Sequence, residues 1–223
     1  GSSVTLKAMY NEATLTPTLG INEAATGYTQ PTTASVEADN LTASTQYIAK
    51  LALPGGKTVS SKYVETSSAE TTKTFSFDLS KLTASDFVKG AYTFTVEKAA
   101  GGVVATKVVN VVTVTLDAGA GYGTFKSNDK TSYLVEAGTK FSALANLTEP
   151  TGATGSYDFV TYANEEGKTL TELASKDVKV DTKLVATYKN PQVATASAAV
   201  SDFAKSTGAL KFTAKYLDTN SKI

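Results

Sequence analysis

The chain has 223 residues, enough for two modules of about 100 residues each. Its 21 basic residues, all lysines, balance 21 acidic residues, so no net field would attract nucleic acid or an anionic membrane. The absence of His, Cys, Trp and Arg excludes an imidazole base, a zinc site of thiolates or imidazoles, a Ser-His-Asp triad and an arginine fork for phosphate. Paired carboxylates remain as a catalytic option, but we expect no enzyme and no cofactor.

The first ten residues belong to neither module of this interpretation. Gly1-Ser2-Ser3 is typical of a cloning remnant, and Thr5–Asn11 resembles the later stretch Lys183–Lys189. We therefore expect residues 1–10 to include the last strand of a preceding repeat, with chance similarity as the alternative. No apolar stretch approaches the roughly 20 residues of a membrane span. A Cys-free, Thr- and Lys-rich composition is common in exported proteins, so we expect an extracellular, bacterial surface location.

Residues 11–110 alternate between apolar and polar side chains, which predicts strands. Short strands separated by Gly- and Pro-containing turns predict an immunoglobulin-like β-sandwich, with one helical turn at Ser80–Val88. The segment Gly90–Val96 resembles the GxYxxxV segment of bacterial immunoglobulin-like domains. This resemblance implies a late core strand whose Tyr92 packs near the preceding corner; any buried strand after a glycine turn is the alternative. The predicted strands include Tyr47–Leu53, Phe75–Leu79, Tyr92–Val96 and Val103–Val114.

Three glycines follow the last of these strands in Gly119-Ala120-Gly121-Tyr122-Gly123. A phosphate-binding loop needs glycines that lead directly into a helix and, in a P-loop, a GK[ST] triplet. Here the polar, turn-forming stretch 124–130 follows, and no such triplet is present. The glycines are therefore predicted to make a hairpin between two strands.

The second half of the chain contains a series of short segments in a fixed order: Val112–Gly119 with Gly123–Phe125, Val135–Phe141, Leu147–Thr151, Tyr157–Tyr162, Glu166–Lys168 and Val178–Tyr188. Through these segments, residues 112–188 resemble the Listeria–Bacteroides repeat of the internalin B-repeat type. The family's two Trp positions are Tyr162 and Tyr188 here, its glycine turn is longer, and one extra residue precedes Leu184. The resemblance implies a β-grasp-like module over 111–190, with one short helix at Ser142–Leu147.

The final segment, 191–223, is interpreted as the first strands of a further sandwich. Thr195–Ala198 and Thr213–Tyr216 loosely resemble Thr33–Val36 and Ile48–Leu51. Together with the opening residues, this predicts a window from an alternating array. Self-matching of Thr- and Ala-rich sequence by chance is the alternative.

Candidate site residues are few. Tyr28, Tyr122 and Tyr133 are the tyrosines that we expect to be exposed and able to stack on a sugar, although core or edge packing explains tyrosines in sheets equally well. An isopeptide bond between Lys7 and Asn110, assisted by a buried Asp78, is a second hypothesis. Glu165-Glu166 is expected to lie on a solvated turn. Asp117, Asp177 and Asp181 offer oxygen ligands of the kind that calcium binds, but they lack the spacing of a calcium-binding loop.

These observations predict a mainly β, non-enzymatic structural module of a bacterial cell-surface protein such as a stalk, adhesin or surface-layer array. Its expected partners are neighbouring modules of the same protein, and cell-wall or host glycans or proteins, with no nucleic acid. The alternative is a carbohydrate- or host-ligand-binding module. A glycosidase would require two carboxylates facing each other across one cleft.

Overall fold

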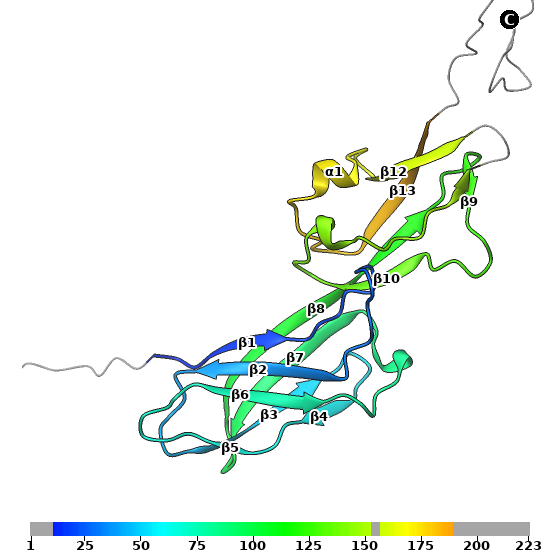
Figure 1. Ribbon diagram of the computed structural model, residues 1–223. Helices are drawn as coiled ribbons and strands as arrows, with labels where there is room; N and C mark the ends of the chain where they lie inside the picture. The colour runs from blue at the N-terminus through cyan, green and yellow to red at the C-terminus, as the bar shows by residue number, and fades with distance from the viewer. Residues whose placement is uncertain (1–10, 153–156, 190–223) are drawn as a thin grey trace, which may run out of the picture. The chain divides into compact units, whose positions relative to one another are not determined.

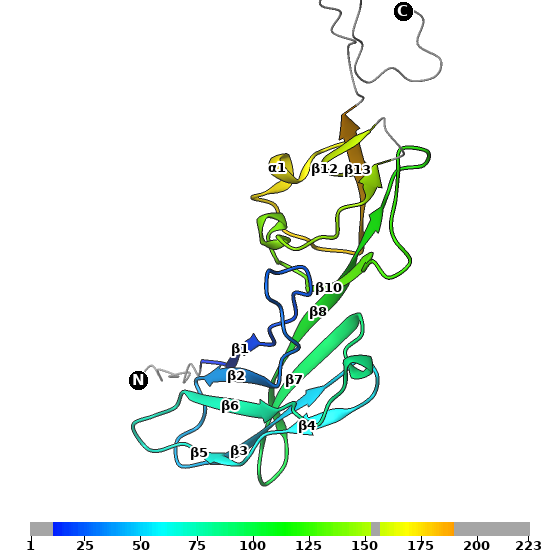
Figure 2. The same ribbon diagram turned by 45° about the vertical axis from the view of Figure 1, so that its right-hand side comes forward.

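The computed structural model describes residues 11–152 and 157–189, and over these the chain is mainly β (Figures 1 and 2). It divides into two compact units. Unit 1 contains the described residues up to Thr113 together with Tyr133–Thr139 and Asp177–Asp181. Unit 2 contains Val114–Ser132, the described residues of 140–176 and those from Thr182 onward. The predicted terminal segments 1–10 and 191–223, and with them Lys7, lie outside the described residues.

Unit 1 consists of two sheets around one core. All strand pairs with a described register within each of them are antiparallel. The first sheet has the order β1 (Thr14–Thr18), β2 (Thr33–Asp39), β6 (Lys73–Asp78). The second has the order β8 (Val103–Asp117), β7 (Gly90–Lys98), β3 (Gln46–Ala52), β4 (Thr58–Ser60), with β5 (Val64–Glu65) also on β3.

The alternating pattern places one face of each strand in this core. Tyr47, Ala49 and Leu51 of β3 are fully buried, while the residues between them are partly exposed. Phe77 of one sheet meets Phe94 of the other edge to face, with ring centroids 5.6 Å apart. Burial of these apolar faces, rather than a disulfide, stabilises the unit.

Tyr92 fixes the corner that precedes β7. Its ring is fully buried, its hydroxyl donates to the Val88 carbonyl at 2.9 Å, and the Val88 N–H donates to the same hydroxyl oxygen at 3.1 Å. Burial raises the pKa of Tyr92, so the hydroxyl stays a donor. The turn before it is the short helix η1 (Ala84–Asp86), inside the predicted 80–88 stretch.

Tyr92→Phe is expected to destabilise unit 1 by about 1–3 kcal/mol, because both polar backbone groups of Val88 lose their partner while the ring stays in place. Urea denaturation measures the change. Tyr63→Phe is the matched control, since Tyr63 is 58 % exposed and its hydroxyl can bond to water. Equal stability of the two variants would contradict a structural role for this corner.

Unit 2 is built on the last part of β8 and on β13 (Thr182–Lys189), which run parallel, with Thr182 opposite Val114 and Val185 opposite Asp117. On the other side of β13, β12 (Asp158–Asn164) pairs antiparallel. A two-stranded ribbon joins β9 (Gly123–Thr124) to β11 (Thr151–Gly152). Two short helical turns complete the unit: η2 (Phe141–Ala143) and α1 (Leu170–Leu173).

The helix expected at Ser142–Leu147 is wrong in position. That stretch begins within the single 3-10 turn η2, whose Phe141 is buried, and continues without helix. The α-helical turn lies later, where Thr169 and Glu172 form a capping box around the first turn of α1.

Residues 133–139 belong to unit 1, although the sequence interpretation counted them in the second module. They include most of β10 (Ser132–Glu136), which bonds to the β1–β2 connection. Glu136 N–H donates to the Ile21 carbonyl and Glu23 N–H donates to the Leu134 carbonyl, both at 2.9 Å. The Glu136 carboxylate also accepts the Ile21 N–H at 2.7 Å.

Candidate functional site

The glycine loop after β8 holds a tyrosine ring. Gly119 has φ +76°, and a Cβ there would lie 3.3 Å from the Tyr188 ring. A Cβ on Gly123 would overlap the Tyr188 hydroxyl and lie 2.6 Å from the carbon that bears it. The Tyr188 hydroxyl donates to the Ala118 carbonyl, which fixes the ring on this loop. The glycines are therefore needed for close approach of a side chain, and no helix follows them.

The predicted hairpin at this loop differs from the observed connection. β8 is followed by β9, which pairs with β11 rather than with β8. β10 is the next strand that returns to β8, so the connection comprises residues 118–131. Leu116 N–H, near the end of β8, donates to the Thr131 carbonyl at 2.8 Å.

Gly123→Ala is expected to destabilise unit 2 by about 1–3 kcal/mol, because the added methyl group displaces the packed Tyr188 ring. Hydrogen exchange of unit 2 amides in increasing denaturant measures this cost. Gly55→Ala is the control, since a Cβ at Gly55 meets nothing within 4 Å. An unchanged unit 2 would show that the ring does not need the glycine.

Three tyrosines line a surface pocket of about 370 Å³ in unit 2, together with Ala186: Tyr122, Tyr157 and Tyr188. The ring of Tyr122 stacks on Tyr188 at 6.2 Å with an interplanar angle of 27°. The rings of Tyr157 and Tyr122 pack edge to face, with centroids 5.0 Å apart and an interplanar angle of 90°. We call these four residues the tyrosine pocket.

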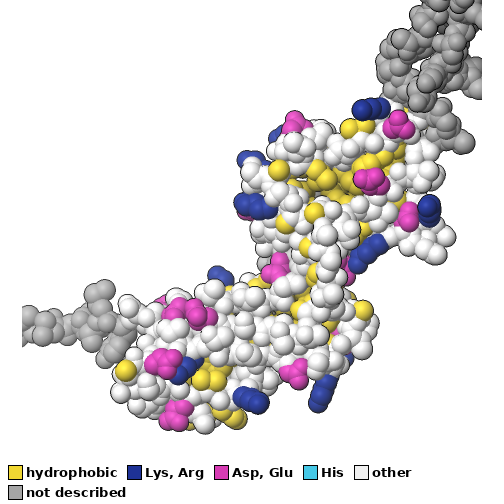
Figure 3. Space-filling view, in the orientation of Figure 1, with side chains coloured by type: hydrophobic (Ala, Val, Ile, Leu, Met, Phe, Trp, Pro, Cys, Tyr) yellow, Lys and Arg dark blue, Asp and Glu magenta, His cyan; other side chains and the backbone are white. Residues whose placement is uncertain are grey.

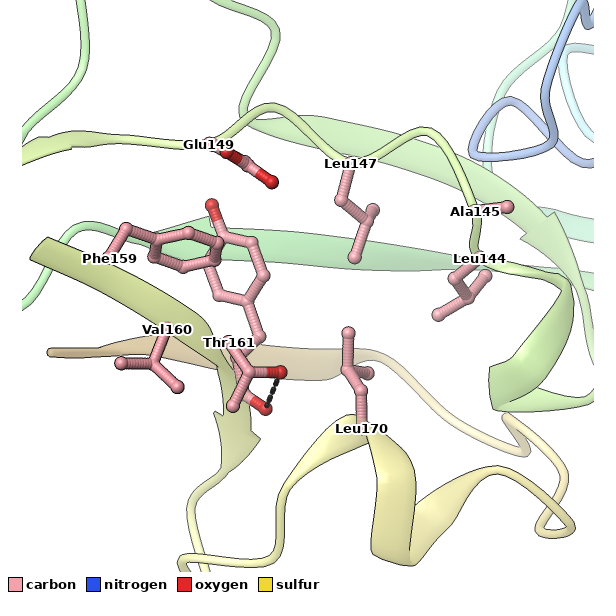
Figure 4. Close-up of a pocket in the computed structure, with 9 residues that line it drawn as sticks. Leu144, Ala145, Leu147, Glu149, Phe159, Val160, Thr161 and Leu170 are labelled. Atoms are coloured by element: carbon pink, nitrogen blue, oxygen red, sulfur yellow. Dashed lines mark hydrogen bonds between the residues drawn. The ribbon is translucent and has the colours of Figure 1, made fainter. Parts of the chain in front are cut away.

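A groove of about 200 Å³, lined mainly by apolar residue types, lies in the same unit. The ring of Phe159, which lines this groove, packs against Tyr188 of the tyrosine pocket and against Tyr162, with ring centroids 6.3 Å and 5.0 Å apart. Leu147 and Leu170 point into the groove from opposite sides, and Glu149 lies at its rim (Figure 4). Figure 3 shows hydrophobic side chains gathered on this face of unit 2.

Charged groups border the tyrosine pocket at Asp117 and Lys183. Lys183 Nζ lies 2.6 Å from the Asp117 carboxylate, which also accepts the Gly119 N–H at 2.8 Å. Lys183, and after it the Gly119 N–H, lower the pKa of Asp117, and Asp117 in turn raises the pKa of Lys183. Burial and, second, the Asp117 charge raise the pKa of Tyr188. At neutral pH the pocket therefore presents the protonated Tyr188 hydroxyl beside the Asp117–Lys183 ion pair.

The lowered pKa of Asp117 predicts an acid-side loss of stability in unit 2. A carboxyl whose pKa is lower in the folded state stabilises the fold above its unfolded pKa, near 4, and this contribution disappears as the pH falls through the folded pKa. Asp117→Asn should therefore reduce the stability of unit 2 at pH 7 and make its dependence on pH shallower below pH 4. Denaturation of both proteins at pH 7 and pH 3 measures this. Parallel pH profiles would contradict the role of Asp117.

Of the tyrosines expected to be exposed, only Tyr122 is mainly so, at 49 %. Tyr28 is half-buried, and burial, then Glu23, raise its pKa to about 12. The expectation of exposure is wrong for Tyr133, which is 2 % exposed because it lies on the same core-facing side of β10 as Val135. Tyr157 and Tyr188, absent from the predicted site, lie beside Tyr122 instead.

The structure speaks against the proposed role of Asp78 in an isopeptide bond. Such a bond needs a buried acid, but Asp78 is exposed at the end of β6, where hydrogen bonds from Ser80 lower its pKa. Asn110 is exposed on β8, which lies in the other sheet. Neither side chain therefore has the desolvated setting that the reaction requires.

The acidic groups have structural surroundings. Glu165 and Glu166 are exposed on the turn after β12. Asp181 pairs with Lys89 at 2.7 Å and accepts the Thr113 N–H at 2.9 Å. Within the described ranges, no group of three or more acidic side chains is arranged to hold a metal ion, and no helix there is long and apolar enough to cross a membrane.

Comparison with known proteins adds no assignment to this site. No family model, no curated protein and no solved structure matches the chain.

Proposed function

We propose that the chain is a non-enzymatic, force-bearing module of a bacterial cell-surface protein, such as a stalk, an adhesin or a surface-layer array. The observation that carries the proposal is the parallel pairing of β8 with β13 in unit 2. The chain enters this unit through β8, and the described part of the unit ends with β13.

Parallel pairing of entering and leaving strands sets how a pulling force acts. Tension along the chain pulls the Val114 end of the paired part of β8 and the Lys189 end of β13 in opposite directions. The strands then slide against each other, so all bonds between Val114–Asp117 and Thr182–Val185 are loaded together. In an antiparallel hairpin pulled at its open end, the bonds would break one after another at lower force.

The Asp117–Lys183 ion pair adds a second connection between the same two strands, at 2.6 Å. Behind them, Leu116 and Leu184 are 5 % and 0 % exposed. Sliding would therefore also drag apolar side chains out of a packed core, which raises the barrier to unfolding.

Unit 1 supports the same function through its strand order. In immunoglobulin lettering the strands are A (β1), B (β2), C (β3), C′ (β4), E (β6), F (β7) and G (β8). The two sheets are then ABE and GFCC′, which is close to the immunoglobulin arrangement. The bond from Tyr92 back to Val88 matches the tyrosine corner of that fold. For unit 2, the parallel β8–β13 pair and the short helix α1 support the β-grasp-like interpretation.

The proposed surface location rests on composition and on the resemblance to the internalin B-repeat type. A chain without cysteine, with every basic residue a lysine, depends on neither disulfides nor reducing conditions. Neighbouring modules of the same surface protein are the proposed partners.

Stretching single molecules by their two ends tests the proposal. Unit 1 and unit 2 should unfold in separate events, which together lengthen the chain by roughly 600 Å at about 3.6 Å per extended residue. The unfolding of unit 2 should require at least as much force as the unfolding of unit 1. Extension of unit 2 without a resolvable force peak would reject the force-bearing function.

The tyrosine pocket favours a second candidate function, binding of a carbohydrate. Aromatic faces and hydroxyls around a pocket of about 370 Å³ suit the apolar face and the hydroxyl groups of one sugar ring. Screening the folded protein on glycan arrays and insoluble wall polysaccharides tests it, with Tyr122→Ala to locate the site and Tyr63→Ala as a surface control. A hit that persists in Tyr122→Ala, or no hit at all, would reject this pocket as the site.

A further inference from the structure

The segment Val103–Val109 of β8 forms an open sheet edge in unit 1. One side of this segment pairs with β7, from Glu97 opposite Val103 to Tyr92 opposite Val109. On the other side, β10 pairs with a later part of β8. The hydrogen bond from the Ala137 N–H, just after β10, to the Asn110 carbonyl at 2.8 Å marks where this pairing ends. Among the strands of the described ranges, none pairs with 103–109 on that side.

The backbone direction of this edge follows from its neighbours. The Asn110 carbonyl and the Leu116 N–H both bond on the β10 side, whereas the Thr113 N–H bonds to Asp181 on the opposite side. Alternate residues of a strand point their N–H and C=O to the same side. Thr106 and Val108 therefore direct their backbone donors and acceptors to the open edge.

The sequence of the edge is nearly symmetric about Thr106. It reads Val-Val-Ala-Thr-Lys-Val-Val, so the same strand of a second copy, running antiparallel, would match it residue by residue. Thr106 would face its own counterpart, and Ala105 would face Lys107 on each side of it.

This register avoids repulsion between the two copies. Lys107 faces Ala105, while a pairing centred on Lys107 would oppose two ammonium groups, which is unfavourable. Val103 and Val108 are 62 % and 43 % exposed in the single chain and would lose part of that exposure on pairing. Between Val96 and Glu97 the register shifts by one extra residue on β8, so the bulge lies on β8 near Val104. This bulge and the exposed Lys107 discourage other, unspecific pairings of the edge.

We infer that two copies of this chain associate through β8, with a twofold axis at Thr106. The Thr106–Thr106 pair would exchange two backbone hydrogen bonds, and the exposed Val108 side chains would pack beside them. One strand on each side buries little area, so the dimer is weak, with a Kd of roughly 10 µM to 1 mM. Side-by-side association of this kind becomes effective where copies are concentrated on a surface.

Sedimentation equilibrium of the purified protein from 10 µM to 1 mM tests the inference. The expected result is a reversible monomer–dimer equilibrium that Thr106→Lys weakens at least tenfold, because two added charges meet on the axis. Thr95→Lys is the matched control, since Thr95 lies opposite Thr106 on β7, one strand away from the edge. A monomer at all concentrations, or equal effects of the two substitutions, would overturn the inference.

A cross-linking test does not depend on a change in stability. The chain contains no cysteine, so Thr106→Cys introduces a single thiol that should be cross-linked into dimers by a short bismaleimide. Ser76→Cys, an exposed position on β6 of the other sheet, should give far less dimer. Equal yields from the two proteins would overturn the twofold axis at Thr106.

Discussion

Phe94→Ala should lower the free energy of unfolding of unit 1 by about 3–5 kcal/mol. Phe94 is fully buried in the middle of β7 and meets Phe77 of the opposite sheet edge to face at 5.6 Å. Removing the ring leaves a cavity between the two sheets, which strands in a hydrogen-bonded ladder cannot easily close. Urea denaturation followed by unit 1 amide signals measures the change.

Thr95→Ala is the control for this substitution. Thr95 is the next residue on the same strand but lies on the opposite, partly exposed face. Its truncation should cost less than about 1 kcal/mol. A loss of similar size for both variants would mean that the core does not lie between the two sheets as described.

Tyr188→Ala should have the largest effect in unit 2, a loss of about 2–4 kcal/mol. The Tyr188 ring covers the glycine loop at Gly119 and Gly123, contacts Phe159 at 6.3 Å and bonds to the Ala118 carbonyl. The substitution would remove the support of the loop and one wall of the tyrosine pocket together. Hydrogen exchange of unit 2 in denaturant measures the loss.

Tyr188→Phe separates the ring from its hydroxyl. It keeps the packing and removes only the bond to Ala118, so a loss of about 1 kcal/mol is expected. If the two Tyr188 variants were equally unstable, the hydroxyl rather than the ring would hold the loop.

The strands of unit 1 could be predicted from the sequence because each has one buried and one exposed face. The alternation over Tyr47–Leu53 reproduces β3 to within one residue at each end. The same rule, applied to Tyr133 and Val135, would have placed Tyr133 in the core. The error came from judging a tyrosine by its type instead of by its strand position.

The helical turn and the site were harder to predict because they depend on distant contacts. Phe141 and Leu144, three residues apart, fit a helix as well as the 3-10 turn that is observed. A local signal for α1 was readable in Thr169-Leu170-Thr171-Glu172, which has the spacing of a capping box. The contact of Tyr188 with Gly123 joins residues far apart in the chain, and no local pattern announces it.

The dependence of unfolding force on pulling direction tests the force-bearing account of unit 2 most directly. Thr113→Cys with Lys189→Cys places handles just before the part of β8 that pairs with β13 and at the end of β13, so that tension slides the two strands. Thr113→Cys with Thr182→Cys places both handles at the paired starts of the strands, since Thr182 lies opposite Val114, and tension peels them apart. At the same loading rate, the sliding geometry should unfold at a severalfold higher force than the peeling geometry. Equal forces in the two geometries would contradict the account.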